Sequence, residues 1–531
     1  MQEPLIKNGK TILSSIDPVR RAERLAESIS VKSKTLYFCP SPLFGYGLAR
    51  LLERLKSETS GSAILCTEAD AELYFLSVQN IPQSVLNDNL FLLTDKFSPE
   101  YLFTVMREKW GVRSFRRIEV VRFTGGWQLF SQLYDSLCDA LRRQIVTEWS
   151  NVMTLAKLGR LYIRNALRNL SLISSFPSID KLSFGSSPIL VLGAGPSLDE
   201  TLEFLPINRT AELPYKIVCV DTCLGALEKR DIKPDLVVIL ESQHWNIRDF
   251  TGCRNQNIPF AIDLSALPAS AKMLSGQGYL FFTQWTKLNI FERLKNDGLL
   301  PKEIPPLGSV GLASVEIARH LTSGKIICAG LDFSFSADKY HARDTPGHRN
   351  SMNNHTRFGG LLNNTAFAAS AFQAVSKTGV KVFSNPIMQN YRDLAESEFS
   401  SDPRLFSFMD TGLPLGIKTL PLDDIFLILT QKQDITAPPS SLVSPPALIS
   451  SEKIRTFIKK ENNRLLELRA ILKGDLKTEE GMLEKLIAEC DYLWAHFPDY
   501  AGGVIPDLSN SSFLRRVRTE IDFTIALLYY R

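Results

Sequence analysis

Several features of membrane, secreted and metal-binding proteins are missing from this 531-residue sequence. No stretch comes near the roughly 18 uninterrupted apolar residues that a membrane-spanning helix needs, and residues 1–15 lack the long apolar core of a secretory signal. The eight cysteines are scattered, with Cys219 and Cys223 as the one close pair, whereas metal and redox sites use tighter clusters. We therefore expect a cytoplasmic protein with buried free thiols, no membrane span and no metal site.

A strong imbalance of charge is missing as well. The chain has 61 Lys and Arg against 57 Asp and Glu, and its net charge is +4. No basic stripe with interleaved aromatic residues is present, so we expect no nucleic acid as a partner. With 44% hydrophobic and 22% charged residues, the composition is typical of a globular protein, and the length favours two to four domains.

Two common nucleotide-binding motifs are absent. The sequence holds no G-x-x-x-x-G-K-[ST] phosphate-binding loop. A glycine turn does follow a strand in ILVLGAGPSLDE (189–200), but Leu198 and Asp199 stand where a dinucleotide fingerprint has its third glycine. NAD and FAD are therefore disfavoured as ligands.

The same turn is still suited to an anion. Gly193 and Gly195 let the backbone turn sharply with amides free to face a ligand. The helix expected after them begins at Pro196, which suits the first helical position, and it directs its positive end at a phosphate. Ser197 adds a hydroxyl beside that phosphate. A glycine turn without a ligand is the alternative.

Strands alternate with helices in two regions, which predicts an α/β fold with parallel sheets. The expected strands of the first region are 34–40, 62–70, 89–94 and 117–123, and those of the second are 188–193, 216–221, 235–240, 260–264, 279–283, 325–333 and 380–384. The domains predicted in this way are 1–125 (α/β), 126–184 (helical connector), 185–433 (central α/β), 434–450 (linker rich in Pro and Ser) and 451–531 (helical).

Acidic residues border two of the central strands. Asp221 ends one expected strand, where an acidic side chain can reach a ribose hydroxyl, while Asp235 opens the next strand and Glu241 closes it. Carboxylates at the carboxyl ends of parallel strands line the crevice where α/β proteins bind ligands. The alternative is that these carboxylates are merely solvated.

Three of the six histidines fall close together, at His341, His348 and His355. Histidine titrates near neutrality and suits proton transfer to a departing phosphate or from an attacking hydroxyl. Their spacing matches no recognised zinc pattern. A surface loop of histidines without a role is the alternative.

The segments LVLGAGPSL, CVDTCLGAL…IKPDLVVILES and GSVGLASVEIARHLTSGKIICAGLDFSFSADKYHA resemble the central domain of the motility accessory factor (Maf) family. These are bacterial cytoplasmic proteins implicated in glycosylating flagellin with sialic-acid-like nonulosonic sugars. The domain is also similar to bacterial sialyltransferases, which use CMP-sugar donors, and to archaeal 6-hydroxymethylpterin diphosphokinases (MptE-like). The resemblance implies a Rossmann-like catalytic domain over 185–433, between an N-terminal α/β domain and a helical C-terminal domain.

The resemblance also implies roles for individual residues. The residues implied to hold the donor nucleotide are Gly193, Gly195, Pro196, Ser197, Leu198, Asp221, Gly308, Ser309 and Tyr340. Tyr340 would steady the donor phosphate, and Asp332, at the end of the strand below the turn at Gly308, is a candidate catalytic residue. His341 matches the Maf loop histidine, but the general base can be His341, His348 or His355.

Three functions remain open from the sequence. The first is transfer of a nonulosonic acid from a CMP donor to Ser or Thr of flagellin, with no metal required. The second is a pterin diphosphokinase, in which Mg²⁺ is held by carboxylates such as Asp221, Asp235 or Asp332. The third is a non-catalytic factor that binds flagellin.

Overall fold

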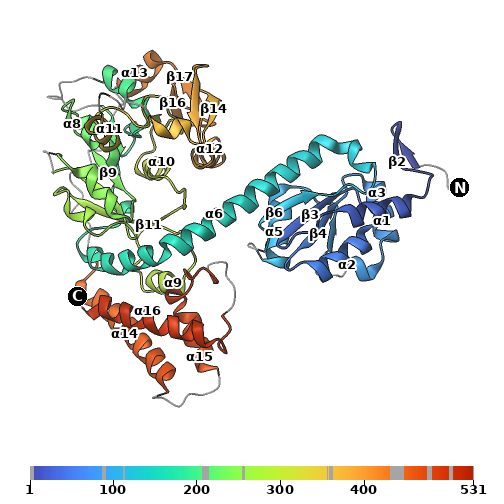
Figure 1. The fold of residues 1–531 in the computed structure, drawn as a ribbon. Helices are drawn as coiled ribbons and strands as arrows, with labels where there is room; N and C mark the ends of the chain where they lie inside the picture. The colour runs from blue at the N-terminus through green and yellow to red at the C-terminus, as the bar shows by residue number, and fades with distance from the viewer. Residues whose placement is uncertain are drawn as a thin grey trace. The chain divides into compact units, whose positions relative to one another are not determined.

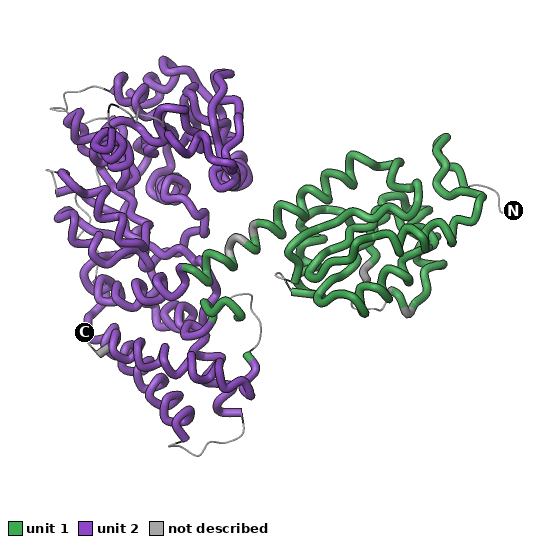
Figure 2. The backbone as a smooth tube through the Cα atoms, in the orientation of Figure 1, with its two compact units in different colours: residues 1–157, 495–506 green, residues 158–494, 507–531 purple. Residues whose placement is uncertain are grey.

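The computed structural model describes residues 5–86, 91–111, 114–205, 214–253, 257–355, 357, 363–430, 448–474, 481–500 and 506–529. The chain divides into two compact units, which Figure 2 shows in different colours. Unit 1 comprises residues 1–157 and 495–506, and unit 2 comprises residues 158–494 and 507–531. Most of the predicted linker, residues 434–447, lies outside the described residues.

Unit 1 is built on a four-stranded parallel sheet with the strand order β5-β4-β3-β6. Strands β3 and β4 are buried at every residue, as continuous apolar runs are in parallel sheets covered on both faces. Its strands are β1 (Leu5–Lys7), β2 (Lys10–Leu13), β3 (Thr35–Pro40), β4 (Ala63–Thr67), β5 (Phe91–Thr94) and β6 (Arg117–Val120). Its helices are α1 (Pro18–Ser28), α2 (Leu48–Glu58), α3 (Ala71–Asn80), α4 (Gln83–Leu86), α5 (Pro99–Trp110) and the first part of α6 (Ser131–Asn169).

Unit 2 contains a nine-stranded sheet with the order β12-β11-β10-β9-β8-β7-β13-β16-β17, and all of its pairings are parallel (Figure 1). The strands are β7 (Ile189–Leu192), β8 (Lys216–Val220), β9 (Leu236–Ile239), β10 (Phe260–Asp263), β11 (Gly278–Thr283), β12 (Glu303–Ile304), β13 (Ile326–Ala329), β16 (Leu405–Phe408) and β17 (Lys418–Leu420). The predicted α/β fold class is confirmed.

The order of the strands creates a switch point at the middle of this sheet. The chain enters at β7, adds β8 to β12 on one side, and returns to place β13 on the other side of β7. The loops that follow β7 and β13 therefore diverge, and such a point is where open α/β sheets bind ligands. Helix α10 (Val310–Leu321) packs on β7, β8, β9 and β13 and buries the centre of one face of the sheet.

The remaining helices of unit 2 include those of residues 451–531, the region that was predicted to be helical. They are α7 (Leu198–Phe204), α8 (Leu224–Glu228), α9 (Asn289–Asn296), α11 (Pro346–Asn353), α12 (Pro386–Phe399), α13 (Leu422–Thr430), α14 (Ser451–Lys473), α15 (Met482–Glu489) and α16 (Ser511–Tyr529). Helix α14 packs against α15 and α16.

One expected strand has different neighbours from those predicted. Residues 380–384 contain β15 (Lys381–Ser384), but it pairs antiparallel with β14 (Phe372–Val375) in a separate two-stranded sheet. The parallel sheet continues instead through β16 and β17, which were not among the expected strands. A short apolar run predicts a strand but does not specify its partner.

The cysteines behave as expected. All eight are free thiols, seven of them are buried, and Cys253 is half-buried. Among the described helices, none has the length and apolar character of a membrane-spanning segment.

Two asparagines join the last turns of α6 to the carboxyl edge of the sheet. Asn165 Nδ2 donates to the carbonyl oxygens of Ser242 and Ser265 (2.9 and 3.2 Å). Asn169 Nδ2 donates to those of Leu264 and Ala266 (2.9 Å each). The loops after β9 and β10 are thus held by side chains of one helix.

We predict that Asn169→Leu destabilises the protein. Loss of the amide leaves two buried carbonyl groups without a donor, which costs about 2 kcal/mol. Urea unfolding checks this value, with Arg168→Leu at the exposed neighbouring position as the control. Equal stability of the two variants would contradict the anchoring role of Asn169.

Candidate functional site

The glycine turn after β7 contacts the loop after β13 through its backbone. Gly193 N donates to Ala329 O and Gly195 N donates to Gly330 O, both at 2.8 Å. A Cβ on Gly193 would lie 2.4 Å from Gly330 O, and one on Gly330 would lie 2.4 Å from Gly193 O. These glycines are needed because two backbones meet at the switch point, and the expectation that their amides face a ligand is wrong for this structure.

The start of the next helix also differs from the prediction. Helix α7 begins at Leu198, not at Pro196, and it has 7 residues. Ser197 N donates to Asp332 Oδ2 at 2.7 Å and Ser197 Oγ donates to Asp332 Oδ1. The serine hydroxyl therefore does not stand free beside a phosphate, and the Leu198 side chain is buried in the core. A carboxylate of the protein occupies the place predicted for the anion.

Asp332 is itself buried. Burial raises its pKa to about 7, and the nearby charge of Asp410 adds to this effect. Asp410 forms a buried ion pair with Lys377 (Oδ1 to Nζ, 2.7 Å). Asp332 therefore lies just after β13, at the switch point, but its carboxylate accepts hydrogen bonds from Ser197 rather than being open to a substrate.

The polar loop after β13 folds over the glycine turn. Ala194 O accepts from Ala342 N at 3.0 Å and contacts His341 Nδ1 at 3.2 Å. Asp199, in the first turn of α7, accepts from Lys339 Nζ at 2.6 Å and from Arg343 N at 2.9 Å. The turn thus positions the predicted loop residues.

Both histidines of this loop, His341 and His348, have Nε2 available, but this nitrogen differs in protonation between the two rings. A carbonyl oxygen can only accept, so His341 Nδ1 carries the proton and Nε2 keeps its lone pair. His348 Nδ1 accepts from Asp344 N at 3.2 Å, so its Nε2 carries the proton in the neutral ring. Burial lowers the pKa of His341, which keeps that ring neutral. His341 Nε2 can accept a proton, and His348 Nε2 can donate a hydrogen bond.

Both histidines line a cavity of about 480 Å³. Its other lining residues are Asp338, Lys339, Tyr340, Arg343, Gly347, Ser351, Asn363, Asn364 and Thr365. The Tyr340 ring stacks on Phe335 (centroids 5.1 Å apart) and meets the His341 ring edge-on (4.8 Å). Lys339 pairs with Asp199 at 2.6 Å, whereas Arg343 Nε lies 3.7 Å from the same carboxylate and Asp338 also lines the cavity. Arg343 and His348 Nε2–H are therefore the groups of this cavity that can contact an anionic ligand.

His355 does not share this position. It is exposed, near the end of the described segment after α11, and it is not among the residues that line the cavity. Of the three histidines that the sequence could not separate, the structure brings together His341 and His348.

The other predicted acidic residues, Asp221 and Asp235, lie apart from this cavity. Asp221 is buried, and its carboxylate accepts from Thr222 N at 2.8 Å and from Asn246 Nδ2 at 2.5 Å. Burial raises its pKa to about 6. Asp235 lies before β9, at the opposite edge, where Ile217 N and Lys216 Nζ bond to it. It is therefore not part of the same site as Asp221.

Gly308 and Ser309 lie at the start of α10. Gly308 has a positive φ of 71°, and a Cβ there would lie 3.0 Å from the Tyr391 ring. The Tyr391 side chain is close enough to Tyr340 and Glu241 for their charges to add to the rise in its pKa that burial causes. Tyr391, on α12, was missed because no sequence motif surrounds it.

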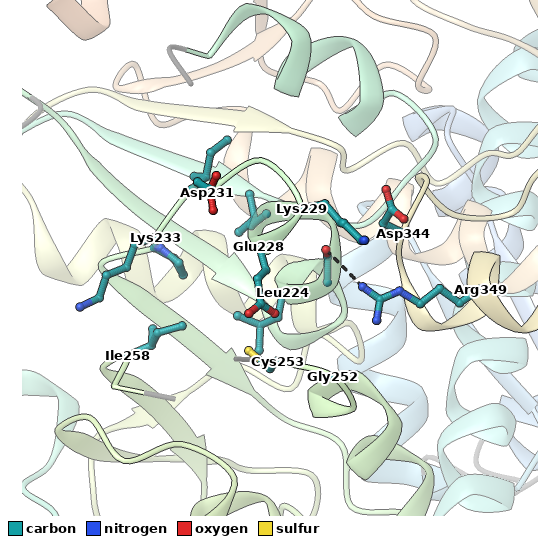
Figure 3. A pocket seen from close by; sticks show the side chains of 14 residues that line it. Leu224, Glu228, Lys229, Asp231, Lys233, Gly252, Cys253, Ile258, Asp344 and Arg349 are labelled. Atoms are coloured by element: carbon teal, nitrogen blue, oxygen red, sulfur yellow. Dashed lines mark hydrogen bonds between the residues drawn. The ribbon is translucent and has the colours of Figure 1, made fainter. Parts of the chain in front are cut away.

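A second cavity, of about 810 Å³, was not predicted (Figure 3). Lys229, Asp344 and Arg349 lie at one side of it in this view, and Lys233 and Ile258 lie at the other. Arg349 Nη2 donates to Gly225 O at 3.4 Å. Helix α11 thus supplies His348 to the first cavity and Arg349 to the second.

We predict that Gly330→Ala destabilises unit 2 much more than Gly185→Ala does. Both glycines have similar positive φ (66° and 63°), but no atom lies within 4 Å of a Cβ at Gly185. Strain at Gly185 alone costs about 1 kcal/mol, whereas the backbone clash at Gly330 raises the cost to about 3 kcal/mol or more. Urea unfolding measures the difference, and equal losses would mean that the contact at the switch point can relax.

We further predict that Asp332 makes stability fall as pH rises. Its pKa is raised from 3.8 to about 7 in the folded state, so the folded protein retains a proton that the unfolded chain releases, and ionisation opposes folding. Asp332→Asn should therefore gain stability relative to the wild type as the pH rises from about 4 to about 7 in urea unfolding. Asp338→Asn, at an exposed position, is the control; a constant difference between Asp332→Asn and wild type would refute the assignment.

Comparison with known proteins agrees with this architecture. Residues 162–338 match the family model described as 6-hydroxymethylpterin diphosphokinase MptE-like. A protein of Treponema pallidum (strain Nichols), described as uncharacterized, is 29% identical over 532 aligned positions, which cover 95% of this chain and 90% of the relative.

A solved structure has the same fold. It is the Maf glycosyltransferase from Magnetospirillum magneticum AMB-1, with a TM-score of 0.52 and 14% sequence identity, over 99% of this chain and 84% of that chain. At this identity the likeness concerns the fold. The chain is therefore an α/β protein that carries an MptE-like domain over residues 162–338 and shares the fold of a Maf glycosyltransferase.

Proposed function

We propose that this protein is a glycosyltransferase that moves a nonulosonic acid from a CMP donor to Ser or Thr of flagellin or a similar protein. The observation that carries the proposal is the 480 Å³ cavity beside the switch point, which is lined by His341 with an unprotonated Nε2 and by His348 with a protonated Nε2. The fold shared with a Maf glycosyltransferase supports glycosyl transfer as the reaction class. The CMP-sugar donor, of the kind that sialyltransferases use, is part of the proposal.

The proposed reaction divides the work between the two histidines. His341 Nε2 takes the proton of the acceptor hydroxyl as its oxygen bonds to the sugar carbon. The bond from that carbon to the phosphate oxygen breaks, and the electron pair leaves with CMP. His348 Nε2–H and the cationic Arg343 stabilise the charge that develops on the phosphate, which is the main source of acceleration in such a scheme. The glycine turn contributes by orienting His341 through Ala194 O.

A pterin diphosphokinase is the second candidate, favoured by the family description over residues 162–338. It requires Mg²⁺ held by several carboxylates. The expected ligands do not fit this role, because the oxygens of Asp221 and Asp332 accept from protein donors and Asp235 lies at the other edge of the sheet. Among the described residues, no group of three or more His, Cys, Asp or Glu side chains is arranged to hold a metal ion.

Calorimetric titration separates the proposals. CMP and CMP-N-acetylneuraminic acid should bind without a divalent cation if the protein is the proposed transferase. Binding of ATP that depends on Mg²⁺ would favour the kinase. No binding of any of these nucleotides would favour a non-catalytic factor that binds flagellin.

We predict that His341→Ala lowers transfer to flagellin at least about 100-fold, the usual effect of losing a general base. His355→Ala, exposed and outside the cavity lining, should retain activity. Because burial lowers the pKa of His341 from 6.5, its basic form persists below that pH, so the acid limb of the pH–rate profile should lie below pH 6.5. Full activity of His341→Ala would transfer the role of base to another group.

A further inference from the structure

Strand β14 (Phe372–Val375) forms one edge of a two-stranded ribbon (Figure 1). It pairs with β15 along its whole length and with no other strand of the described chain. The opposite edge of the ribbon is covered, because Phe383 of β15 exchanges two backbone hydrogen bonds with Phe335 (2.8 and 2.9 Å). The ribbon therefore has one covered edge and one edge without a partner strand.

The hydrogen-bond pattern shows which groups of β14 lie at the free edge. Ser376 N donates to Val380 O at 2.9 Å, so these two residues form a hydrogen-bonded pair at the end of the ribbon. In an antiparallel ribbon, such pairs alternate with pairs whose N–H and C=O groups point away from each other. Gln373 and Val375 therefore direct their backbone groups away from β15, and these groups bond to no other described segment. The free edge offers both donors and acceptors to a further strand.

The side chains around this edge are apolar and exposed. Phe372 and Val375 of the strand are 39% and 61% exposed. Phe367 and Val380, which lie beside the strand in the sequence, are 65% and 51% exposed. Proteins usually protect an edge strand with a charged residue or a proline, but residues 366–376 contain neither. An unprotected edge of this kind is a surface to which an extended peptide adds as a strand.

The ribbon lies close to the cavity of the proposed reaction. The Phe383 ring stacks on Phe335 (centroids 6.5 Å apart), and Phe335 stacks on Tyr340 (5.1 Å), which lines that cavity. Thr365 also lines the cavity, and the chain from there to Phe372 spans at most about 24 Å. An extended segment of eight residues, about 27 Å long, is therefore long enough to reach from β14 to the cavity.

We propose that the free edge of β14 holds an extended, uncharged segment of the acceptor protein as an added strand. This inference rests on the proposed function, in which a hydroxyl group of the acceptor polypeptide must reach His341. Segments rich in Ser and Thr are neutral, and Thr favours the extended conformation. The residue types that carry the acceptor hydroxyl therefore also suit this edge.

The neighbouring charges and contacts agree with a short, neutral strand. Lys377 is paired with Asp410 (2.7 Å), and Lys381 lies on β15, the strand away from the free edge. Lys377 N donates to Gly412 O at 2.9 Å, so the loop after β16 closes the edge beyond β14. The open stretch is thus β14 itself, with 4 residues. A contact of this size aligns an acceptor segment without holding it tightly.

A pair of proline variants tests the edge. Val375→Pro removes an N–H at the free edge, where a strand tolerates proline. Lys381→Pro is the matched control, because Lys381 lies directly opposite Val375 and its N–H points to the other side of the ribbon. Val375→Pro should raise KM for monomeric flagellin at least about fivefold, the effect of one hydrogen bond, without changing kcat or the affinity for CMP-N-acetylneuraminic acid. Equal KM values for the two variants would overturn the proposal.

Hydrogen exchange of the unmodified protein gives a test that does not depend on the folding of a variant. The amides of Gln373 and Val375 should exchange freely in the protein alone and become protected when monomeric flagellin is added. Those of Ala374 and Ser376 should be protected throughout, because they bond to the other half of the ribbon. Protection of Gln373 and Val375 in the protein alone would mean that a second copy or another segment of this chain covers the edge, which would overturn the proposal.

The same measurement separates failure of this inference from failure of the proposed function. If flagellin protects Gln373 and Val375 but receives no sugar, the docking surface stands and the proposed reaction fails. If flagellin receives the sugar while these amides stay unprotected, the reaction stands and the docking surface is overturned. If flagellin neither receives sugar nor protects the edge, both proposals fail.

Discussion

The backbone contact between the loops after β7 and β13 is the constraint on which the rest of unit 2 depends. Gly195 N and Gly193 N donate to carbonyl groups of the neighbouring loop, and this approach is closer than any side chain would allow. The amides of Gly193 and Gly195 in this turn are already hydrogen-bonded, but the Ala194 carbonyl group can still accept. The turn therefore acts as a hydrogen-bond acceptor. Ala342 and His341 use that acceptor, which fixes the loop over the turn and determines which nitrogen of the imidazole faces the cavity.

The protein's own carboxylates take the positions in which a bound anion was expected. Asp332 accepts from Ser197, and Asp199 accepts from Lys339 and from the backbone of Arg343. In the proposed function, the ligand's charge is therefore recognised by the loop that lines the 480 Å³ cavity rather than by the start of α7. The proposed chemistry follows this arrangement, because the cations and histidines of the loop surround a space large enough for part of a nucleotide-sugar.

The sequence predicted where strands and helices lie better than it predicted which segments contact one another. Buried apolar runs such as those of β7, β8 and β13 identify strands reliably because both faces are covered. The motif around Tyr340 and His341 also identified residues that line a cavity. The acceptors that compete for the amides of Gly193 and Gly195 could not be read from the turn, because Ala329 and Gly330 are distant from it in sequence.

Because the thiols are buried, the rate at which they are chemically modified measures how often this fold opens. Seven sulfhydryl groups are shielded from solvent and the eighth, at Cys253, is half-covered, while burial raises the pKa of Cys253 to about 11. Because an alkylating reagent attacks the thiolate, the native protein reacts slowly even at this position. The rate at which the other seven become modified therefore reports how often each region unfolds locally, without any label added to the chain.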